Sequence, residues 1–595
     1  MSSFVRHDPW GRGQPLEFHY RSRNPFGTLI ALAGRSGWYY VWPLAAFVAK
    51  QSPVWVIPIL VAHGIDTLSD PVRHPLHNLL VLASFTLLLI AQNVPMHTYF
   101  IHLVSSIIRR MEQRLRMALV IRLQQLSIDF HDTTETGRLQ AKVLRDVEQI
   151  QMMSMYLCES VTNGATTIVF ALCLTATKEP LMLLVYLVLV PLSTLLIRYF
   201  KRSIRERNQD FRASMEATSA EVAQMLDMIP VTRAHGLEES AINRFQQEID
   251  LLLQRGVHLD RLNAIFASST WVTFQVTTIL GFCVTFWLCR AGRISVGDVV
   301  LYQALLTQIV NSIGIFTNVY PQVAKGAESI RSIGEVLECP DLELNEGKQP
   351  VTGVAGAITF DRVDYRYPNA KAPALKAFSL DVAAGDCVAF VGPSGAGKST
   401  VMGLAIGFRR PTAGRILLDG SDMQSLDMRQ YRRLISVVPQ QTYLFRGTIR
   451  ENITFGLDTV DRKRLDEVVE MTHVSEFIRN LPAGLDTPVG EGGSTLSGGQ
   501  RQRIAIARAM IRDPRVIIFD EATTALDAES ENLVQDAIYR MIQGRTTFIV
   551  AHRLSTVRKA GKIVFLRSGQ IVEQGRYDEL MAQRGEFFRL NELAG

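Results

Sequence analysis

The sequence predicts a multi-domain fold, in which an all-α transmembrane domain of six helices precedes a soluble α/β domain. Up to about residue 324, long apolar stretches alternate with basic loops, as they do in membrane proteins. From residue 357 onward, short β-branched runs alternate with helical stretches, a pattern typical of a largely parallel sheet. The six runs are Cys387–Val391, Arg415–Leu418, Ile435–Val438, Val516–Phe519, Thr546–Val550 and Lys562–Leu566. We therefore expect a transmembrane domain at 1–335, a linker at 336–356 and an α/β domain at 357–595.

Composition and charge agree with this division. Hydrophobic residues make up 47% of the 595 residues and charged residues 20%, and the mean hydropathy of +0.11 is above zero. Composition alone also fits a large soluble enzyme with a big core. The net charge of +6 is not gathered in a basic tail of the kind that binds nucleic acid. The six scattered cysteines include no CxxC pair, which argues against a zinc site.

Six stretches are candidates for membrane spans, because a helix needs about 20 predominantly apolar residues to cross a bilayer core. They are Trp38–Ala62, Leu79–Leu103, Val161–Thr177, Leu181–Phe200, Ile265–Cys289 and Val296–Val319. The first contains three prolines and, in its middle, Lys50. Basic residues are concentrated in the N-terminal segment and in the long loops after the second and fourth stretches, which predicts that both termini and both long loops lie in the cytoplasm.

The two long loops contain helix-compatible sequence rich in Leu, Met, Gln, Glu and Arg. We therefore expect the membrane helices to continue well into the cytoplasm. The expected turns lie near Asp129–Gly137 and near Asp227–Gly236.

A phosphate-binding loop is the sharpest chemical signal in the α/β region. The segment Gly392–Thr400 (GPSGAGKST) matches the pattern G-x-x-x-x-G-K-S/T, and it lies between the apolar run Cys387–Val391 and the helical stretch Val401–Ile406. Glycines let backbone N–H groups approach phosphate oxygens, and the start of a helix adds a favourable dipole. Lys398 is placed to neutralise the β- and γ-phosphates of a nucleotide, and Ser399 to bind magnesium.

A second signal is the run Val516–Phe519, which reads as a buried strand and is followed by Asp520 and Glu521. In a phosphoryl-transfer site, Asp520 is placed to hold magnesium and Glu521 to orient or deprotonate the attacking water. Two carboxylates after a strand also fit a solvated turn or a helix cap. The phosphate-binding loop upstream favours the catalytic interpretation.

The segment Leu496–Gln500 (LSGGQ), followed by a helix-compatible stretch, completes a set of motifs. Together with Tyr367, Gln440, Asp527 and His552, and in this order and spacing, the set resembles that of ABC-type ATPases. Six spans ahead of one α/β P-loop ATPase domain resemble an exporter-type half-transporter of the ABC transporters. The resemblance covers essentially the whole chain.

The resemblance implies roles for individual residues. The expected catalytic residues are Glu521, His552, Lys398 and Gln440. The expected nucleotide-binding residues are Tyr367, Gly392, Ser394, Gly395, Gly397, Lys398, Ser399, Thr400, Ser497, Gly498, Gly499 and Gln500. The expected magnesium ligands are Ser399, Gln440 and Asp520. The residues alone leave alternatives open: Tyr367 also fits an ordinary strand aromatic and His552 a structural histidine, and Gln441 competes with Gln440.

The resemblance also implies cofactors, partners and a mechanism. ATP with Mg²⁺ binds between the phosphate-binding loop of one chain and the LSGGQ segment of a second half-transporter chain. The intact motif set favours a homodimer, and a heterodimer also fits. Hydrolysis then drives alternating access in the lipid bilayer, and we expect export of an amphipathic lipid, drug or peptide. The expected location is the bacterial inner membrane, with several spans and a cytoplasmic nucleotide-binding domain, and no nucleic acid is expected as a partner.

Other functions remain open at this point. An importer on the same scaffold, for example for siderophore uptake, is the main alternative to export. A soluble ABC-type ATPase that acts on nucleic acid or in translation is disfavoured by the six spans and by the distribution of basic residues. An ATP-gated channel or sensor is a further possibility.

Polar side chains within the spans are candidates for cargo contacts, because such groups face protein or water rather than lipid. We predict Lys50, Gln308 and Asn311 as contact residues. Hydrogen bonding between packed helices is the alternative for the polar residues, and snorkelling is the alternative for Lys50. If Lys50 lines the cavity, the cargo carries an anionic group.

Overall fold

The computed structural model describes residues 20–33, 38–70, 72, 74–368, 370–457, 459–493, 495–520, 528–550 and 557–594. The chain forms two compact units. The first, which we call the membrane unit, comprises Met1–Leu123 and Gly137–Cys339. The second, which we call the α/β unit, comprises Gln124–Thr136 and Pro340–Gly595, so a short segment of the first long loop belongs with the C-terminal part of the chain.

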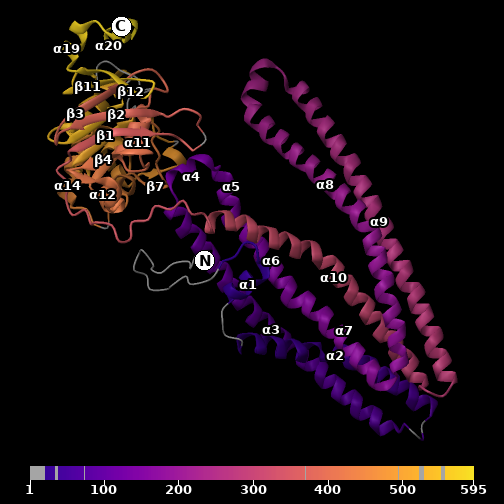
Figure 1. Cartoon of the computed structure of the whole chain (residues 1–595). Coiled ribbons are helices and arrows are strands. Elements are labelled where there is room, and N and C mark those ends of the chain that lie inside the picture. Colours follow the sequence, from indigo (N-terminus) through magenta and orange to yellow (C-terminus); the bar gives the residue numbers. More distant parts are fainter. Residues whose placement is uncertain are drawn as a thin grey trace. The chain divides into compact units, whose positions relative to one another are not determined.

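Helices make up the described part of the membrane unit (Figure 1). In chain order they are α1 (Pro25–Ala33), α2 (Trp38–Ser69), α3 (Leu76–Gln125), α5 (Thr136–Ala141), α6 (Val147–Tyr156), α7 (Thr162–Lys178), α8 (Leu183–His235), α9 (Glu238–Arg290) and α10 (Val296–Leu337). The π-helical turns Lys142–Asp146 and Leu157–Val161 join α5, α6 and α7 into one long helix. The 3-10 turn Pro180–Met182 leads into α8, which pairs with α9 as a long hairpin.

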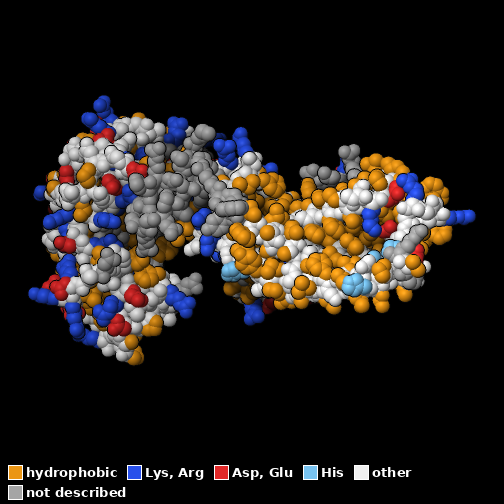
Figure 2. Space-filling model, turned by 90° about the horizontal axis from the view of Figure 1, so that it is seen from below, with side chains coloured by type: hydrophobic (Ala, Val, Ile, Leu, Met, Phe, Trp, Pro, Cys, Tyr) orange, Lys and Arg blue, Asp and Glu red, His pale blue; other side chains and the backbone are white. Residues whose placement is uncertain are grey.

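Five helical segments among the described residues are long and apolar enough to cross a membrane. They are Val41–Ser69, Leu76–Gln125, Thr136–Lys178, Glu238–Arg290 and Val296–Leu337, and they match five of the predicted spans. The sixth predicted span, Leu181–Phe200, forms the 3-10 turn and the start of α8, where the structure leaves several side chains undescribed. Hydrophobic side chains dominate the visible face of the membrane unit in Figure 2, as expected of a surface that meets lipid.

The helices continue beyond the bilayer, as the sequence predicted. Helix α3 has 50 residues, and α8 and α9 have 53 each. At about 1.5 Å per residue they are roughly 75–80 Å long, more than twice the ~30 Å of a hydrocarbon core. Helix α8 ends at His235 and is capped by Gly236, whose φ of 65° is left-handed, and α9 begins at Glu238.

A glutamine from a neighbouring helix supports the backbone where a proline interrupts α2. Pro53 has no N–H, so the carbonyl of Ala49, four residues earlier, lacks its usual helical donor. Gln92 of α3 donates from Nε2 to this carbonyl at 2.6 Å. Ser52 Oγ, within α2, donates to the same carbonyl at 2.7 Å. Since an unsatisfied backbone group is costly in hydrocarbon, the two contacts explain how α2 tolerates proline within a span.

Asp66, near the end of α2, fixes the start of α10. Its carboxylate accepts hydrogen bonds from Ser295 Oγ and from the backbone N–H of Gly297, both at 2.7 Å. The two helices approach so closely that a Cβ on Gly297 would lie 2.0 Å from the carbonyl oxygen of Ala62. A glycine is therefore required where α10 begins.

The described part of the α/β unit contains two main sheets and a short ribbon. Its strands are β1 (Ile358–Tyr365), β2 (Leu375–Val382), β3 (Cys387–Val391), β4 (Ala413–Leu418), β5 (Ser421–Asp422), β6 (Ile435–Val438), β7 (Gly447–Thr448), β8 (Pro488–Val489), β9 (Val516–Asp520), β10 (Thr546–Val550), β11 (Lys562–Arg567) and β12 (Gln570–Gly575). Its helices are α4 (Ile128–Thr133), α11 (Lys398–Ala405), α12 (Met428–Arg433), α13 (Ile449–Ile453), α14 (Arg462–Met471), α15 (Val474–Ile478), α16 (Gly498–Met510), α17 (Ala528–Ile542), α19 (Tyr577–Gln583) and α20 (Glu586–Ala594).

The larger sheet has the strand order β12-β11-β3-β10-β9-β6, and its strands are parallel except for β12. The smaller sheet, β2-β1-β4-β5, is antiparallel. All six predicted β-runs form strands, but the run Arg415–Leu418 lies in β4 of the antiparallel sheet rather than in the parallel one. Strands β1, β2 and β12 were not predicted. In β1 and β2 partly or fully exposed positions interrupt the buried ones, and β12 has no fully buried position, so none of the three shows a continuous apolar run.

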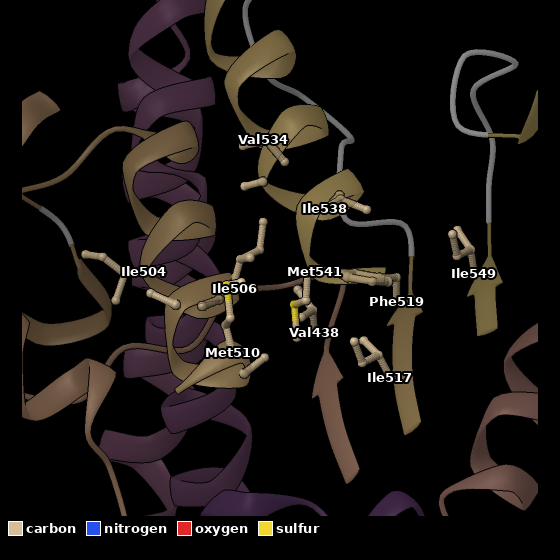
Figure 3. Close-up of a cluster of buried hydrophobic side chains, with 14 of the residues drawn as sticks. Val438, Ile504, Ile506, Met510, Ile517, Phe519, Val534, Ile538, Met541 and Ile549 are labelled. Carbon is tan, nitrogen blue, oxygen red and sulfur yellow. The ribbon is translucent and has the colours of Figure 1, made fainter. Parts of the chain in front are cut away.

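The parallel sheet separates two hydrophobic cores. Ala389 of β3 and Phe519 of β9 pack on one face with α16 and α17, and their neighbours Phe390 and Ile518 pack on the other face with β1, β2 and α11. Figure 3 shows the first core, in which side chains of α16 and α17 point toward those of β6, β9 and β10. Because both faces are buried, the sheet holds the carboxyl ends of its strands in fixed register.

Candidate functional site

The phosphate-binding loop has the predicted strand–loop–helix setting. It follows β3 and ends where α11 begins at Lys398. Gly392 adopts a φ of 148°, and a Cβ at this position would lie 2.1 Å from the carbonyl oxygen of Leu566 in β11. A residue with a side chain would therefore displace the loop from the sheet edge. Within the loop, Ser394 and Gly395 are exposed.

Lys398 lies over the loop that precedes it. Its ammonium group donates to the carbonyl oxygens of Gly392 (2.7 Å) and Pro393 (3.0 Å), and the residue is only 6% exposed. The next residue, Ser399, is exposed in the first turn of α11, whereas Thr400 is buried. A buried cation beside the start of a helix gives this loop the electrostatic character of an anion site.

The parallel sheet places further predicted residues at the same edge. Asp520 ends β9 and pairs in register with Val550, the last residue of β10, and β10 lies between β3 and β9. Gln440 follows β6 by two residues and is exposed. The carboxyl ends of β3, β9 and β6 therefore bring the loop, a carboxylate and an amide to one edge of the sheet. The predicted residues Glu521, Asp527 and His552 lie outside the described residues.

The LSGGQ segment forms the start of helix α16. Ser497 is the N-cap: its Oγ accepts from the backbone N–H of Gln500 (3.3 Å), and the Gln500 side chain accepts in return from the N–H of Ser497 (2.9 Å). Gly498 and Gly499 occupy the first turn, so no side chain projects from either position, and Gly498 is partly exposed whereas Gly499 is buried. This is a second helix start suited to a phosphate group.

Tyr367, the predicted adenine-binding residue, lies just after β1. Its hydroxyl is 3.1 Å from Thr400 Oγ1, so the ring is linked to α11. Tyr365 packs edge-on against it, with the ring centroids 5.0 Å apart. The Arg409 guanidinium lies over the Tyr367 ring, 4.6 Å from its centroid. Sequence reasoning did not single out Arg409, because its partners are distant in the chain.

A charged clamp joins the linker to the end of α11. Arg432 binds both carboxylate oxygens of Glu343 (3.0 and 2.6 Å) and also donates to the carbonyl of Gly407, just after α11 (2.9 Å). Burial raises the pKa of Glu343, but the hydrogen bonds from Arg432 and Asn345 outweigh it and hold this pKa below its usual value. Glu343 is therefore an ionised anchor between the linker and α11.

Lys50, predicted as a cargo contact, has a carboxylate partner within the membrane unit. Its side chain is 9% exposed, and Nζ lies 3.6 Å from Glu159 Oε1 and 3.3 Å from His97 Nδ1. The ammonium also lies over the rings of Phe47 and Phe100, 4.9 and 4.5 Å from their centroids. A cargo anion at this position would have to compete with Glu159 for the cation.

The two other predicted cargo residues lie on α10. Gln308 donates from Nε2 to the carbonyl of Val54 (3.0 Å), which lacks its helical donor because the residue four positions later is Pro58. This contact is hydrogen bonding between packed helices, the alternative to a cargo role. Asn311 is exposed, and its cargo role stays a prediction.

Two family models match the chain: the ABC transporter transmembrane region at residues 46–313 and the ABC transporter model at residues 375–524. Among related proteins, the ATP-dependent lipid A-core flippase of Chromobacterium violaceum is 34% identical over 487 residues, which cover 81% of this chain and 82% of the flippase. The putative multidrug export ATP-binding/permease protein YgaD of Bacillus subtilis is 32% identical over 481 residues, 80% of this chain and 82% of that protein.

A solved structure agrees with these matches. A bacterial Atm1-family ABC exporter with ATP bound superposes with a TM-score of 0.80 at 25% identity, over 93% of this chain and 98% of the exporter. The motifs, the fold and the relatives lead to the same family. The chain belongs to the ABC transporters, as an exporter-type half-transporter in which a helical transmembrane region is fused to one ATP-binding domain.

Proposed function

We propose that this chain hydrolyses ATP with the residues that its motifs supply, and that it uses the hydrolysis to move an amphipathic lipid across the membrane. The observation that carries the proposal is the shared sheet edge, where the phosphate-binding loop, Asp520 and Gln440 follow β3, β9 and β6. Lys398 neutralises phosphate charge, Glu521 orients or deprotonates the attacking water, and His552 contacts the γ-phosphate. Gln440 reaches the magnesium ion and the attacking water and senses the membrane domain.

A magnesium ion fits the oxygen donors at this edge. Ser399 offers a hydroxyl, Asp520 a carboxylate and Gln440 an amide oxygen, and hard oxygen ligands of this kind suit Mg²⁺. No group of three His, Cys, Asp or Glu suited to a metal occurs among the described residues. We propose that protein oxygens and the nucleotide together hold the ion. The bound ion would neutralise phosphate charge.

A homodimer is the assembly we propose. One chain carries one phosphate-binding loop and one LSGGQ segment. In the proposed site the loop of one chain faces the LSGGQ segment of another across an interface, so the site requires two chains. Ser497 and its helix start would then contact phosphate groups held by Lys398 of the second copy. The motif set shows no degenerate position, which supports two identical chains rather than a pair of unequal ones.

The proposed cargo is a lipid with an anionic headgroup, moved outward from the cytoplasmic side of a bacterial inner membrane. The flippases among the relatives support a lipid, and their bacterial origin supports this location. Basic residues in both long loops support a cytoplasmic ATPase domain. Lys50 and Asn311 remain the proposed contact residues, with Glu159 as the group that an anionic headgroup displaces.

Lipid translocation in proteoliposomes tests this proposal. The full-length protein is reconstituted with a trace of fluorescent lipid A or of phosphatidylglycerol, and the loss of accessible probe on one leaflet is followed after ATP addition. We expect ATP-dependent translocation that Glu521→Gln abolishes and that Lys50→Ala reduces for the anionic probes only. Translocation that is equal with and without ATP would refute the proposal, and a Lys50→Ala variant with unchanged rates for every anionic probe would remove Lys50 from the cargo site.

A further inference from the structure

Arg409 contacts both the ring of Tyr367, which is predicted to bind adenine, and helix α4 from the first long loop. It follows α11 and precedes β4, and its side chain is 12% exposed. The guanidinium carbon lies 4.6 Å from the centroid of the Tyr367 ring, and Nη1 donates to the Tyr365 hydroxyl at 3.1 Å. The cation thus lies over one face of the Tyr367 ring, an arrangement that polarises the ring and restricts its orientation.

Two carboxylates of α4 hold this guanidinium. Nη1 donates to Asp129 Oδ1, and Nη2 donates to Asp132 Oδ2 at 2.5 Å. The Tyr365 hydroxyl also donates to Asp129, at 3.2 Å. A planar guanidinium can bind two carboxylates and a ring face at once, which a lysine ammonium cannot. The orientation of Arg409 over Tyr367 is therefore fixed by α4.

Along the chain, helix α4 connects two parts of the membrane unit. It lies between α3 and α5 in sequence, and both helices belong largely to the membrane unit, whereas α4 belongs to the α/β unit. On the other side, the Tyr367 hydroxyl reaches Thr400 of α11 at 3.1 Å. The contacts therefore run without interruption from α4 through Arg409 and Tyr367 to the helix of the phosphate-binding loop.

We propose that Arg409 is a positioning residue, which sets the Tyr367 ring for adenine and makes the affinity for adenine nucleotides depend on Asp129 and Asp132. This inference rests on the proposed role of Tyr367. When α4 is docked, the guanidinium holds the ring and polarises it. When α4 withdraws, Arg409 loses both carboxylates and the ring loses its support. Nucleotide affinity and the position of the first long loop are then linked in both directions.

The test measures ATPase kinetics of the full-length protein in lipid nanodiscs. We expect Arg409→Ala, and Asp129→Asn combined with Asp132→Asn, to raise the KM for ATP about five- to tenfold, the size of a lost cation–π or stacking contact, with less than a twofold change in kcat. Arg409→Lys should recover only part of this affinity. Arg410→Ala is the matched control, because the neighbouring arginine is exposed, and its KM should equal that of the wild type.

Two further measurements separate positioning from general damage. Tripolyphosphate has no base, so its inhibition constant should be the same in the wild type and in Arg409→Ala, and an equal weakening of ATP and tripolyphosphate would overturn the proposal. In a Tyr367→Ala background, Arg409→Ala should have no further effect on KM. If Tyr367→Ala leaves KM unchanged, the adenine role of Tyr367 fails; if Tyr367→Ala raises KM and Arg409→Ala does not, only the present inference fails.

Discussion

At the residue scale, the polar side chains of the spans illustrate two uses of an amide in a membrane. Gln92 and Gln308 both donate to carbonyls of α2 that proline leaves without a backbone donor. Asn311, about one turn beyond Gln308 on α10, is exposed. An amide side chain therefore serves helix packing at Gln92 and Gln308, whereas at Asn311 it is exposed and is the proposed cargo contact.

The role of Gln308 can be tested by a double-mutant cycle with Pro58. Gln308→Ala should lower the thermal unfolding temperature, because the Val54 carbonyl loses its donor, at a cost of about 1–3 kcal/mol. In a Pro58→Ala background the backbone N–H of residue 58 can bond this carbonyl, so Gln308→Ala should cost much less there. Asn311→Ala is the control and should leave the unfolding temperature unchanged. Equal losses in both backgrounds would contradict the backbone role.

At the element scale, a charged clamp ties the linker to the end of α11. Glu343 is bound by Arg432, which also binds the carbonyl of Gly407. Because this clamp and the phosphate-binding loop lie at opposite ends of α11, the linker is connected to the loop through one short helix.

The clamp predicts a pH dependence of stability. The pKa of Glu343 is lowered in the folded protein, so its stabilising effect is complete above the unfolded value of about 4.3 and is lost as the pH falls through the folded value. Glu343→Gln should therefore lower the unfolding temperature at pH 7, and the difference from the wild type should shrink below about pH 4. Glu346→Gln, at an exposed glutamate nearby, should match the wild type throughout. A difference that stays constant with pH would argue against an ionised clamp.

Local patterns predicted the elements, and distant contacts escaped prediction. The phosphate-binding loop, the LSGGQ helix start and the six β-runs each depend on a few consecutive residues, and the structure contains all of them. The contact between Arg409 and Asp129 joins residues 280 positions apart, and nothing near either residue signals the other. For the same reason the sequence placed Asp129 at a turn of the membrane domain, whereas its helix α4 belongs to the α/β unit.

At the scale of the whole molecule, one chain supplies only part of each proposed ATP site. The ABC transporter model and the ABC transporter transmembrane region model each match one stretch of the chain, at residues 375–524 and 46–313. In the proposed dimer, ATP closes the two domains and hydrolysis parts them, and this shifts the population of inward-facing and outward-facing states. In this proposal, the long helices and α4 link the membrane unit to the α/β unit along the chain.

The central claim is most directly tested by measuring ATP hydrolysis by the purified chain alone in lipid nanodiscs, beside Lys398→Ala and Glu521→Gln. We predict Mg²⁺-dependent hydrolysis by the wild type and a loss of at least about 100-fold in both variants, with Glu521→Gln still binding ATP and accumulating as a closed dimer. Normal turnover in Lys398→Ala or in Glu521→Gln would contradict the assignment of the catalytic site.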